Sequence, residues 1–474
     1  MKKTVTFVSI LLMVIFTNST NGQDFITATQ SDNGKTVHLL TDQVLEIQLP
    51  RKASTGYIWC LSDTDAKKSG EFCIALAGDD EFIQDPDPVK INGNVLAGQS
   101  GKQIIRYTGK SQGVATLSLE LKRPWEKNQP AIDSFALTII SDGKYLGNYV
   151  PPVKTMPEHT TSTPKNLPSH FDWRPYCTPI KDQQQCGDCW AFAGVGTLEC
   201  NIKIVDGITR DISEAYVTNC YTLSLGCNGG LCPHELWVAP KGAVYESDYP
   251  WTPDLANGIS GSCGGPYPYH ETVDSYANVP GANLLGMPPD ANIKSAIYNN
   301  GPVWVDVCAS SSAWSNYTGG IYTGNGLIFN HCVVLVGWCD STSVTGGGYW
   351  ILRNSWGSDW GMGGYMYISY GSDVVGLFAN YIVYKGGTLQ NFLNTANQEN
   401  DKIKIYPVPA TDNLRIETIQ DAVIEIFNEQ GQEVKSITAG SGNVDIDISG
   451  FVRGIYIIKA KSDQGVWVRK FVKE

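Results

Sequence analysis

Residues 181–192 constrain the fold more than any other part of this chain of 474 residues. Two cysteines, Cys186 and Cys189, stand in a C-x-x-C spacing after polar, turn-forming residues, and the apolar run 190–193 follows directly. This pattern is typical of a loop that enters a buried helix, with Cys189 in the first turn. There a thiol meets free N–H groups and the positive end of the helix dipole, which favour the thiolate. The C-x-x-C spacing alone leaves a metal site, a redox dithiol and a disulfide open.

The N-terminus predicts export. Met1-Lys2-Lys3, the apolar run 5–16 and the polar residues that follow have the pattern of a secretory signal peptide, which we place at residues 1–22. No later run reaches the ~18 apolar residues that a transmembrane segment needs. The net charge of −12 argues against nucleic acid as a partner. We therefore expect an extracellular or cell-surface protein that passes through the periplasm.

The cysteines also fit export. The chain has 13 cysteines, most of them between Cys177 and Cys339. In an oxidising compartment most cysteines should pair, and an odd number leaves at least one free thiol, which we expect to be Cys189. Cys60 and Cys73 stand apart from the others and are predicted to pair with each other.

The hydrophobic pattern divides the chain into several domains. Residues 24–142 alternate apolar and polar side chains between closely spaced turns, which predicts an all-β sandwich. Residues 402–474 repeat this pattern in a smaller β-sandwich. The proline-rich residues 143–166 predict an exposed linker that a protease can cut, and the polar residues 386–401 predict a second linker.

Residues 167–385 have the length of one domain. Helical patterns come first, at 189–204, 213–219 and 291–298. Strand patterns follow, at 303–308, 332–338, 349–354 and 364–370. Helices followed by an antiparallel sheet predict an α+β domain of two lobes, with a substrate cleft between them.

A nucleophilic cysteine needs a base, a residue that orients the base, and a donor for the developing oxyanion. His331 stands at the head of a buried strand pattern and could serve as the base. Asn354, in Arg353-Asn354-Ser355-Trp356, could orient it. Gln183, on the loop before Cys189, could donate to the oxyanion. A zinc site made of Cys186, Cys189 and His331 is the alternative, but no second clustered pair completes it.

In order and spacing, the segments around Gln183 and Cys189, Cys227-Asn228-Gly229-Gly230, Asn330-His331 and Asn354-Ser355-Trp356-Gly357 resemble the papain family of cysteine proteases. The resemblance covers about 167–385. It implies that Cys189 is the nucleophile and His331 its imidazolium partner, with Asn354 orienting His331 and Trp356 shielding their hydrogen bond. It also implies an oxyanion hole made of Gln183 and the Cys189 N–H, with no cofactor and no metal.

The resemblance further implies binding residues and disulfides. Substrate contacts are expected at Gly229, Gly230, Leu231, Cys232, Asp306, Asn330, Cys332, Trp356 and Asn380. Asp306 stands where the family has Ala or Val, and we expect it to give some tolerance of basic P2 residues. Asp188 stands where Ser or Ala is usual and could raise the Cys189 pKa slightly by like-charge repulsion. The implied bridges are Cys186–Cys227, Cys220–Cys263 and Cys177–Cys200, while the pairing of Cys232, Cys308, Cys332 and Cys339 cannot be read.

Three turns of the 24–142 sandwich resemble the binding loops of chagasin-like inhibitors of papain-type proteases. They are Ser54-Thr55-Gly56-Tyr57, Gly98-Gln99-Ser100-Gly101 and Arg123-Pro124-Trp125. The family usually has Asn and Pro where Lys52 and Ala53 stand. The resemblance implies inhibitory contacts from Thr55, Gly56, Gly98, Gly101, Arg123, Pro124 and Trp125. The alternative is a sandwich whose turns merely contain Gly and Pro.

Residues 402–474 resemble the C-terminal sorting domain of the type IX secretion system, which implies secretion machinery as a partner. A carbohydrate-binding or adhesive β module is the alternative. Together these features predict an exported endopeptidase zymogen that hydrolyses protein or peptide substrates and is held inactive by its own inhibitor-like domain. Two other functions stay open: a cysteine acyltransferase or peptide ligase, and a surface-delivered inhibitor with a vestigial enzyme domain.

Overall fold

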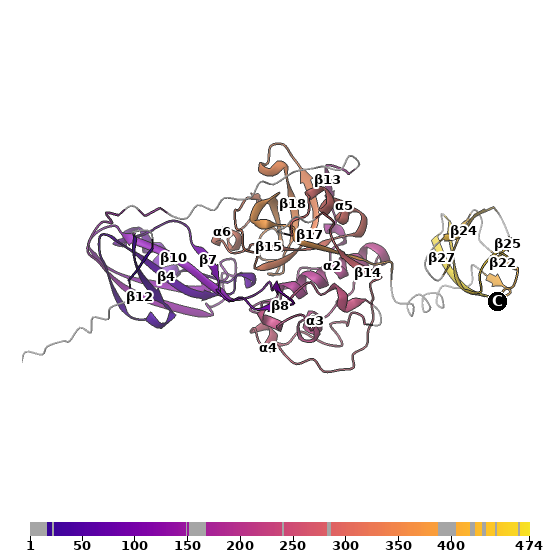
Figure 1. Cartoon of the computed structure of the whole chain (residues 1–474), viewed down its shortest axis with the longest axis horizontal. Coiled ribbons are helices and arrows are strands. Elements are labelled where there is room, and N and C mark those ends of the chain that lie inside the picture. Colours follow the sequence, from indigo (N-terminus) through magenta and orange to yellow (C-terminus); the bar gives the residue numbers. More distant parts are fainter. Residues whose placement is uncertain are drawn as a thin grey trace, which may run out of the picture. The chain divides into compact units, whose positions relative to one another are not determined.

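The computed structural model describes residues 17–20, 23–147, 149–150, 167–238, 241–281, 286–386, 404–417, 422–428, 433–440, 443–462 and 465–474. The chain divides into two compact units, Met1–Gly386 and Gly387–Glu474 (Figure 1). The predicted signal peptide and both predicted linkers lie largely outside the described residues. Among the described helices, none combines the length and apolar composition that crossing a bilayer requires.

The N-terminal part of the first unit is a β-sandwich, as predicted (Figure 1). One sheet has the strand order β1-β2-β4-β10-β6, with β7 beside β10, and the other has the order β3-β12-β11-β5. Alternate side chains point inward, among them Ile47, Leu117 and Leu137, and form one core between the sheets. Its strands are β1 (Thr17–Thr20), β2 (Gln23–Thr29), β3 (Thr36–Leu39), β4 (Gln43–Arg51), β5 (Ile58–Leu61), β6 (Ile74–Leu76), β7 (Glu81–Gln84), β10 (Gly101–Gly109), β11 (Gly113–Lys122) and β12 (Asp133–Ser141).

Two smaller elements belong to the sandwich. The short helix α1 (Asp63–Lys68) follows β5, and the hairpin β8 (Lys90–Ile91) and β9 (Asn94–Val95) precedes β10. Asn92 and Gly93 form the hairpin turn with φ of 51° and 82°. A two-residue turn with both φ values positive is the type that Asn-Gly favours. The turn reverses the chain direction, so that β9 pairs with β8 and leads into the loop 96–98.

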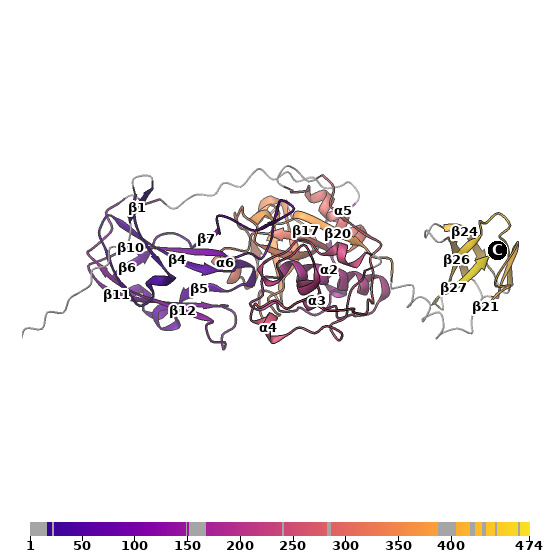
Figure 2. The same ribbon diagram turned by 60° about the horizontal axis from the view of Figure 1, so that its bottom comes forward.

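The following domain has helices first and a sheet second, as predicted (Figure 2). Its sheet has the order β14-β20-β15-β17-β18-β19-β16, with β13 beside β17. The helices are α2 (Cys189–Asp206), α3 (Glu214–Cys220), α4 (Pro253–Ala256), α5 (Asp290–Asn300) and α6 (Ser312–Ser315). The strands are β13 (His170–Asp172), β14 (Ser275–Asn278), β15 (Val303–Val307), β16 (Ile321–Tyr322), β17 (His331–Asp340), β18 (Gly348–Arg353), β19 (Tyr365–Ser369) and β20 (Leu377–Val383).

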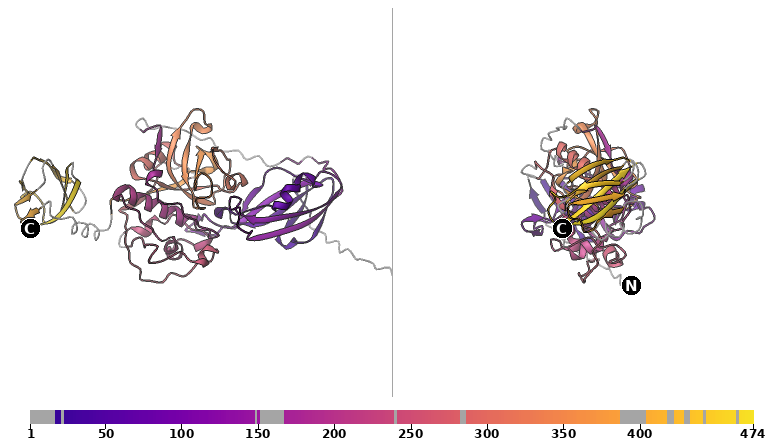
Figure 3. Two further views of the ribbon diagram at one scale, coloured as in Figure 1. Left: turned by 180° about the vertical axis from the view of Figure 1, so that it is seen from behind. Right: turned by 90° about the vertical axis from the view of Figure 1, so that its right-hand side faces the viewer.

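Helix α2 is the central helix of this domain and packs on β15 and β17 (Figure 3). Its first 14 residues are buried, so the helix is covered by protein on all sides rather than along one stripe. It ends at Gly207, which has φ 72° and donates its N–H to the Lys203 carbonyl. A left-handed glycine in this place closes the helix without the steric cost of a Cβ atom.

The second unit is a small β-sandwich, as predicted. Three strands, β21 (Lys404–Tyr406), β22 (Asn413–Glu417) and β25 (Asn443–Asp447), form one sheet. The other has the order β24-β23-β26-β27, with β23 (Ala422–Phe427), β24 (Glu433–Ala439), β26 (Gly454–Ser462) and β27 (Gly465–Lys473). Leu414, Ile424 and Phe471 lie in its core.

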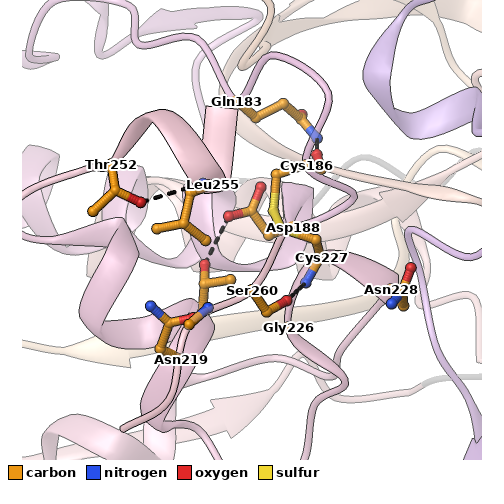
Figure 4. The surroundings of a disulfide bond; sticks show 12 residues. Gln183, Cys186, Asp188, Asn219, Gly226, Cys227, Asn228, Thr252, Leu255 and Ser260 are labelled. Carbon is orange, nitrogen blue, oxygen red and sulfur yellow. Dashed lines mark hydrogen bonds between the residues drawn. A yellow bond between two sulfur atoms is a disulfide. The ribbon is translucent and has the colours of Figure 1, made fainter. Parts of the chain in front are cut away.

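Two of the four predicted disulfides are present. Cys186 is bonded to Cys227 (Figure 4), and Cys220 is bonded to Cys263. The prediction of a Cys60–Cys73 bridge was wrong. Cys60 lies opposite Glu120 on β11, whereas Cys73 lies against Gly113 at the other end of that strand. Seven residues of strand span about 23 Å, far more than the roughly 7 Å of Cα separation that a disulfide tolerates.

The Cys177–Cys200 bridge is also absent, and both residues are buried thiols. Their side chains interact with each other instead, and the Cys177 thiol donates to the Trp173 carbonyl, 3.6 Å away. The expectation that most cysteines pair was therefore wrong, since Cys232, Cys308, Cys332 and Cys339 are thiols as well. Cys189 is a thiol, as expected.

Candidate active site

Cys189 is the first residue of α2, and its side chain is buried. The side chains of Cys332 and His331 both interact with its sulfur. Burial opposes ionisation of this thiol, but the interactions with Cys332 and His331 and the charge of His331 hold the Cys189 pKa well below its ordinary value. This environment favours a thiolate at the N-terminus of the helix.

The ring of His331 is fixed from two sides. Its Nε2 lies 2.8 Å from Asn354 Oδ1, which leaves Nδ1 for the sulfur of Cys189. The indole of Trp356 stacks on the ring with centroids 5.0 Å apart. His331, Asn354 and Trp356 are all buried. The ring can therefore neither turn away nor exchange its Asn354 hydrogen bond for water.

The side chain of Gln183 is held on the loop before Cys189 (Figure 4). Its Nε2 donates to the Cys186 carbonyl at 2.8 Å, and its Oε1 accepts from Ser355 Oγ at 2.7 Å. The disulfide between Cys186 and Cys227 ties this loop to the following segment. A primary amide carries two N–H groups, so the second can serve an oxyanion together with the Cys189 N–H.

Asp188 stands at the N-cap of α2 and is fully buried. Its Oδ2 accepts a hydrogen bond from Thr218 Oγ1 at 2.7 Å, while Oδ1 has no partner. Burial raises the Asp188 pKa to about 8, with the Thr218 hydrogen bond opposing it. At neutral pH the group is therefore largely neutral, and the like-charge effect on Cys189 that the sequence suggested is small.

Replacing Asp188 by Asn should flatten the pH dependence of stability. The pKa of this carboxyl group is near 4 in the unfolded chain and about 8 in the folded protein. The folded protein therefore loses stability as the pH rises through this window. The amide of the variant cannot ionise, and its oxygen can still accept from Thr218. The free energy of unfolding is measured by urea titration. The difference between Asp188→Asn and the wild type should rise in favour of the variant by up to about 1.4 kcal/mol per pH unit in this window. Parallel pH profiles for the two proteins would contradict the buried neutral carboxyl group.

The first sandwich loop contacts the candidate site through its backbone and through the side chain of Lys52. The Ser54 carbonyl accepts a hydrogen bond from Trp356 Nε1 at 2.7 Å. Lys52 Nζ donates to the Cys227 carbonyl at 2.8 Å. Gly56 has φ 79°, and a Cβ atom there would come within 3 Å of both Trp125 and Trp356. Thr55 is buried and closes the turn by donating to the Lys52 carbonyl.

The second loop lies along the peptide-binding segment that the sequence predicted. The Gly230 N–H donates to the Ala97 carbonyl at 3.2 Å, and the Gly98 N–H donates to the Asn330 carbonyl at 3.1 Å. Ala97 and Gly230 form an antiparallel bridge, as when a peptide strand adds to an exposed edge. Gly98 has φ 87°, and a Cβ atom there would lie 2.0 Å from the Gly187 carbonyl oxygen.

The contacts of this loop are shifted from those the sequence suggested. Leu96, Ala97 and Gln99 lie against Gly229, and Gly98 lies against both Gly187 and Gly229. Gly101 instead begins β10 and packs against Phe82 and Ile83 of the sandwich itself.

The third loop contributes a buried cation and a ring. Arg123 Nη1 lies 2.8 and 2.9 Å from the two oxygens of Asp182, and Nη2 donates to the Gln184 carbonyl at 2.9 Å. Its Nε donates to the Thr55 carbonyl, which joins the third loop to the first. After Pro124, Trp125 stacks on Trp356 with ring centroids 5.5 Å apart.

Arg51 is a contact residue that the sequence reasoning missed. It is the last residue of β4 and is 2% exposed. Its Nη1 donates to the Ser310 carbonyl at 2.7 Å, and its Nε donates to the Tyr57 carbonyl. The alternating pattern of β4 contained a signal. Arg51 falls on the inward-facing side of β4, two residues after Leu49 and four after Ile47, where an apolar residue is expected.

The S2 pocket, which would receive the P2 side chain of a substrate, is expected from the resemblance to be lined by residues of several elements: Leu231, Cys232, Asp306, Cys332 and Asn380. Cys332 Sγ donates to Asp306 Oδ1 at 2.9 Å, across the β15–β17 pair. Asn380, on β20, is held by His234 Nδ1 at 2.6 Å, and the Cys232 carbonyl accepts from Tyr221. Leu231 packs against the buried cluster that contains Cys189 and Cys332. Burial raises the Asp306 pKa well above its ordinary value, so its expected effect on basic P2 residues stays a prediction.

The zinc alternative does not fit this geometry. Cys186 is bonded to Cys227 and cannot bind a metal as a thiolate together with Cys189 and His331.

Comparison with known proteins agrees with this geometry. The model of the papain family cysteine protease matches residues 167–385. The model of the chagasin family peptidase inhibitor I42 matches residues 39–139, and that of the secretion system C-terminal sorting domain matches residues 404–474.

Individual relatives match the catalytic region. Cysteine proteinase 3 of Entamoeba histolytica is 32% identical over 45% of this chain and 68% of its own length. Cysteine proteinase COT44 of Brassica napus is 33% identical over 51% of this chain and 76% of its own. The solved structure of a bromelain protease from Ananas comosus with the inhibitor E64 is 30% identical, over 46% of this chain and 100% of that one, with a TM-score of 0.40.

Proposed function

Because this chain belongs to the papain family of cysteine proteases and carries a chagasin-like inhibitor domain, we propose that it is an endopeptidase precursor blocked by that domain until the linker is cut. One observation carries the proposal. The backbone of Ala97 and Gly98 occupies the hydrogen-bonding positions of Gly230 and Asn330, beside Cys189. An extended substrate would need the same positions.

In the proposed reaction, the Cys189 thiolate attacks the carbonyl carbon of the scissile bond. The oxyanion that forms accepts hydrogen bonds from the Cys189 N–H and from Gln183. His331 gives its proton to the leaving amine, which frees the new N-terminus and leaves an acyl-enzyme. His331 then takes a proton from water, and the resulting hydroxide releases the acyl group as a carboxylate. Asn354 keeps the ring in the required orientation.

The proposed block needs no covalent bond. The three loops together cover Trp356 and the segment 229–230, and they bury Arg51 and Arg123. The positive φ of Gly98 brings the backbone against Gly187, in a conformation that an L-residue at the same place would not adopt without strain. We propose that this conformation keeps the loop from being cut as a substrate.

Cleavage of the linker is the proposed activation step. While the inhibitor domain is tethered, its effective concentration at the cleft is of millimolar order. After cleavage, docking of the inhibitor domain becomes an association between two separate molecules. Its extent then depends on the protein concentration, so dilution releases the domain. Activation should therefore depend on protein concentration once the linker is cut.

The sorting domain implies export through type IX secretion. We propose that the precursor reaches the cell surface or the medium with the inhibitor domain still in place, so that the protease stays inactive during transport. The secretion machinery that reads the second unit is the proposed partner.

The test uses the full chain with Cys189→Ala, which cannot cut itself. Binding of a fluorescent substrate-like peptide is measured before and after a protease cuts within residues 143–166. We expect the uncut chain to bind on the order of 100-fold more weakly than the cut and diluted chain. An uncut chain that admits the peptide as readily as the cut chain would contradict the block. Mass spectrometry of the wild-type products separates hydrolysis from acyl transfer, since transfer would leave the acyl group on an amine instead of a free carboxylate.

A further inference from the structure

A second thiol lies beside the candidate nucleophile. Cys332 follows His331 on β17 and lies in the same buried cluster of side chains as Cys189, where the two sulfurs interact. Both sulfurs are thiols, and both residues are 0% exposed. The other cysteine of the C-x-x-C pair, Cys186, is already bonded to Cys227 and cannot react with Cys189 as a thiol.

The position of Cys332 is fixed by its neighbours. Cys332 is the register partner of Asp306 in the antiparallel β15–β17 pair, and its Sγ lies 2.9 Å from Asp306 Oδ1. Trp304, two residues before Asp306, donates its indole N–H to the carbonyl of Trp190 at 3.1 Å. This bond ties β15 to the first turn of α2, where Cys189 lies. The two sulfurs are therefore held close by the sheet and the helix rather than by a mobile loop.

From this arrangement we propose that Cys332 is a resolving cysteine for Cys189, so that oxidation of the released protease by a hydroperoxide ends in a reversible Cys189–Cys332 disulfide. The inference rests on the proposed role of Cys189 as a reactive thiolate.

The reaction has two steps. The Cys189 thiolate attacks one peroxide oxygen; the O–O bond breaks, the sulfur becomes a sulfenic acid, and the other oxygen leaves as water or an alcohol after taking a proton. The Cys332 sulfur then attacks the Cys189 sulfur. The S–O bond breaks, the S–S bond forms, and the hydroxyl group leaves with the Cys332 proton as water. The peroxide supplies all the oxidising equivalents.

The disulfide would inactivate the protease without destroying it. Without a nearby thiol, a sulfenic acid on Cys189 can be oxidised further to the sulfinic acid, which thiols do not reduce. A disulfide returns to two thiols by exchange with a small thiol. Because the inhibitor loops cover the site in the precursor, the reaction belongs to the protease after release of the inhibitor domain.

The test uses the full chain after its linker has been cut and the sample diluted. Alkylation of Cys189 by iodoacetamide first shows that the thiol is open and reactive. A parallel sample receives hydrogen peroxide, and peptide mapping then identifies the cross-linked or oxidised residues. We expect a new link between the peptides that contain Cys189 and Cys332, with activity that dithiothreitol restores.

Two variants, each compared with its own untreated activity, make the test specific. After peroxide and then dithiothreitol, Cys332→Ser should recover roughly tenfold less activity than the wild type and should carry sulfinic acid on Cys189. Cys339→Ser, at the other end of the same strand, should recover like the wild type.

A reactive Cys189 that gives sulfinic acid and no cross-link in the wild type would overturn the inference. Equal recovery by Cys332→Ser would overturn it as well. A cut chain that iodoacetamide cannot label would instead contradict the proposed role of Cys189, and this inference with it.

Discussion

The uncut chain with Arg123→Ala will hydrolyse a fluorogenic peptide roughly 30 to 100 times faster than the uncut wild-type chain. Arg123 is buried and makes hydrogen bonds to Asp182 and the Gln184 carbonyl in the catalytic domain. Truncating one partner of a buried, hydrogen-bonded charge pair costs about 2–5 kcal/mol. Asp182 is about one-third exposed and regains water, so the lower end of this range applies. The loss of these contacts weakens the docking of the inhibitor domain. A larger fraction of the uncut chains then has an open cleft, and the initial rate of hydrolysis rises with that fraction.

The matched control is Arg106→Ala. Among the residues that the structure describes, the hydrogen bonds and ion pairs of Arg106 that contact carboxylates go to Glu46 and Glu81 of the sandwich itself. It should leave the rate of the uncut chain near the wild-type value. Gel analysis during the assay confirms that the chains stay intact. Equal rates for Arg123→Ala and Arg106→Ala would mean that the third loop does not hold the inhibitor domain in place.

Gln183→Ala will lower kcat of the cut protein on the order of 10²–10³-fold, with little change in KM. The amide is expected to bind the oxyanion, which exists only in the transition state and the tetrahedral intermediate. Its removal therefore acts on the chemical step rather than on substrate binding. Steady-state kinetics with a peptide substrate measures both parameters.

Stability must be separated from catalysis in this variant. Gln183 is buried, and its loss leaves the Ser355 hydroxyl without its acceptor, which costs about 1–3 kcal/mol of folding free energy. Circular dichroism should nevertheless show a folded protein at the assay temperature. Gln185→Ala changes a partly exposed side chain on the same loop and should keep its turnover. Undiminished kcat in a folded Gln183→Ala protein would remove Gln183 from the proposed mechanism.

The fold and the grouping of the candidate site residues could be predicted because their signals are local. Helix α2 follows from the apolar run 190–193 and the helical pattern after it, and β17 follows from an apolar run that begins after His331. The residues proposed for catalysis lie next to these runs, in short motifs whose order along the chain specifies a known arrangement. The hydrogen bonds from His331 to Asn354 and from Ser355 to Gln183 then follow from that arrangement.

The contacts between the domains and the cysteine pairing could not be predicted in the same way. Whether Cys60 reaches Cys73 depends on strand register, and register is set by the turns and by packing rather than by either cysteine. Arg51 and Ala97 make their contacts only because two domains meet. The β4 pattern marks Arg51 as an unusual inward residue, but no periodicity in either domain says which residues of the other domain it contacts. The proximity of Cys332 to Cys189 likewise depends on how β17 faces the start of α2.

The proposed block places the inhibitor domain over Cys189 in the intact precursor. Labelling of the full wild-type chain with a thiol-directed epoxide, before and after the linker is cut, reports on the accessibility of Cys189. Mass spectrometry should find the label on Cys189 only after cutting and dilution, at a rate that falls as the protein concentration rises. Labelling of Cys189 at the same rate in the intact chain would show that the inhibitor domain does not block the site.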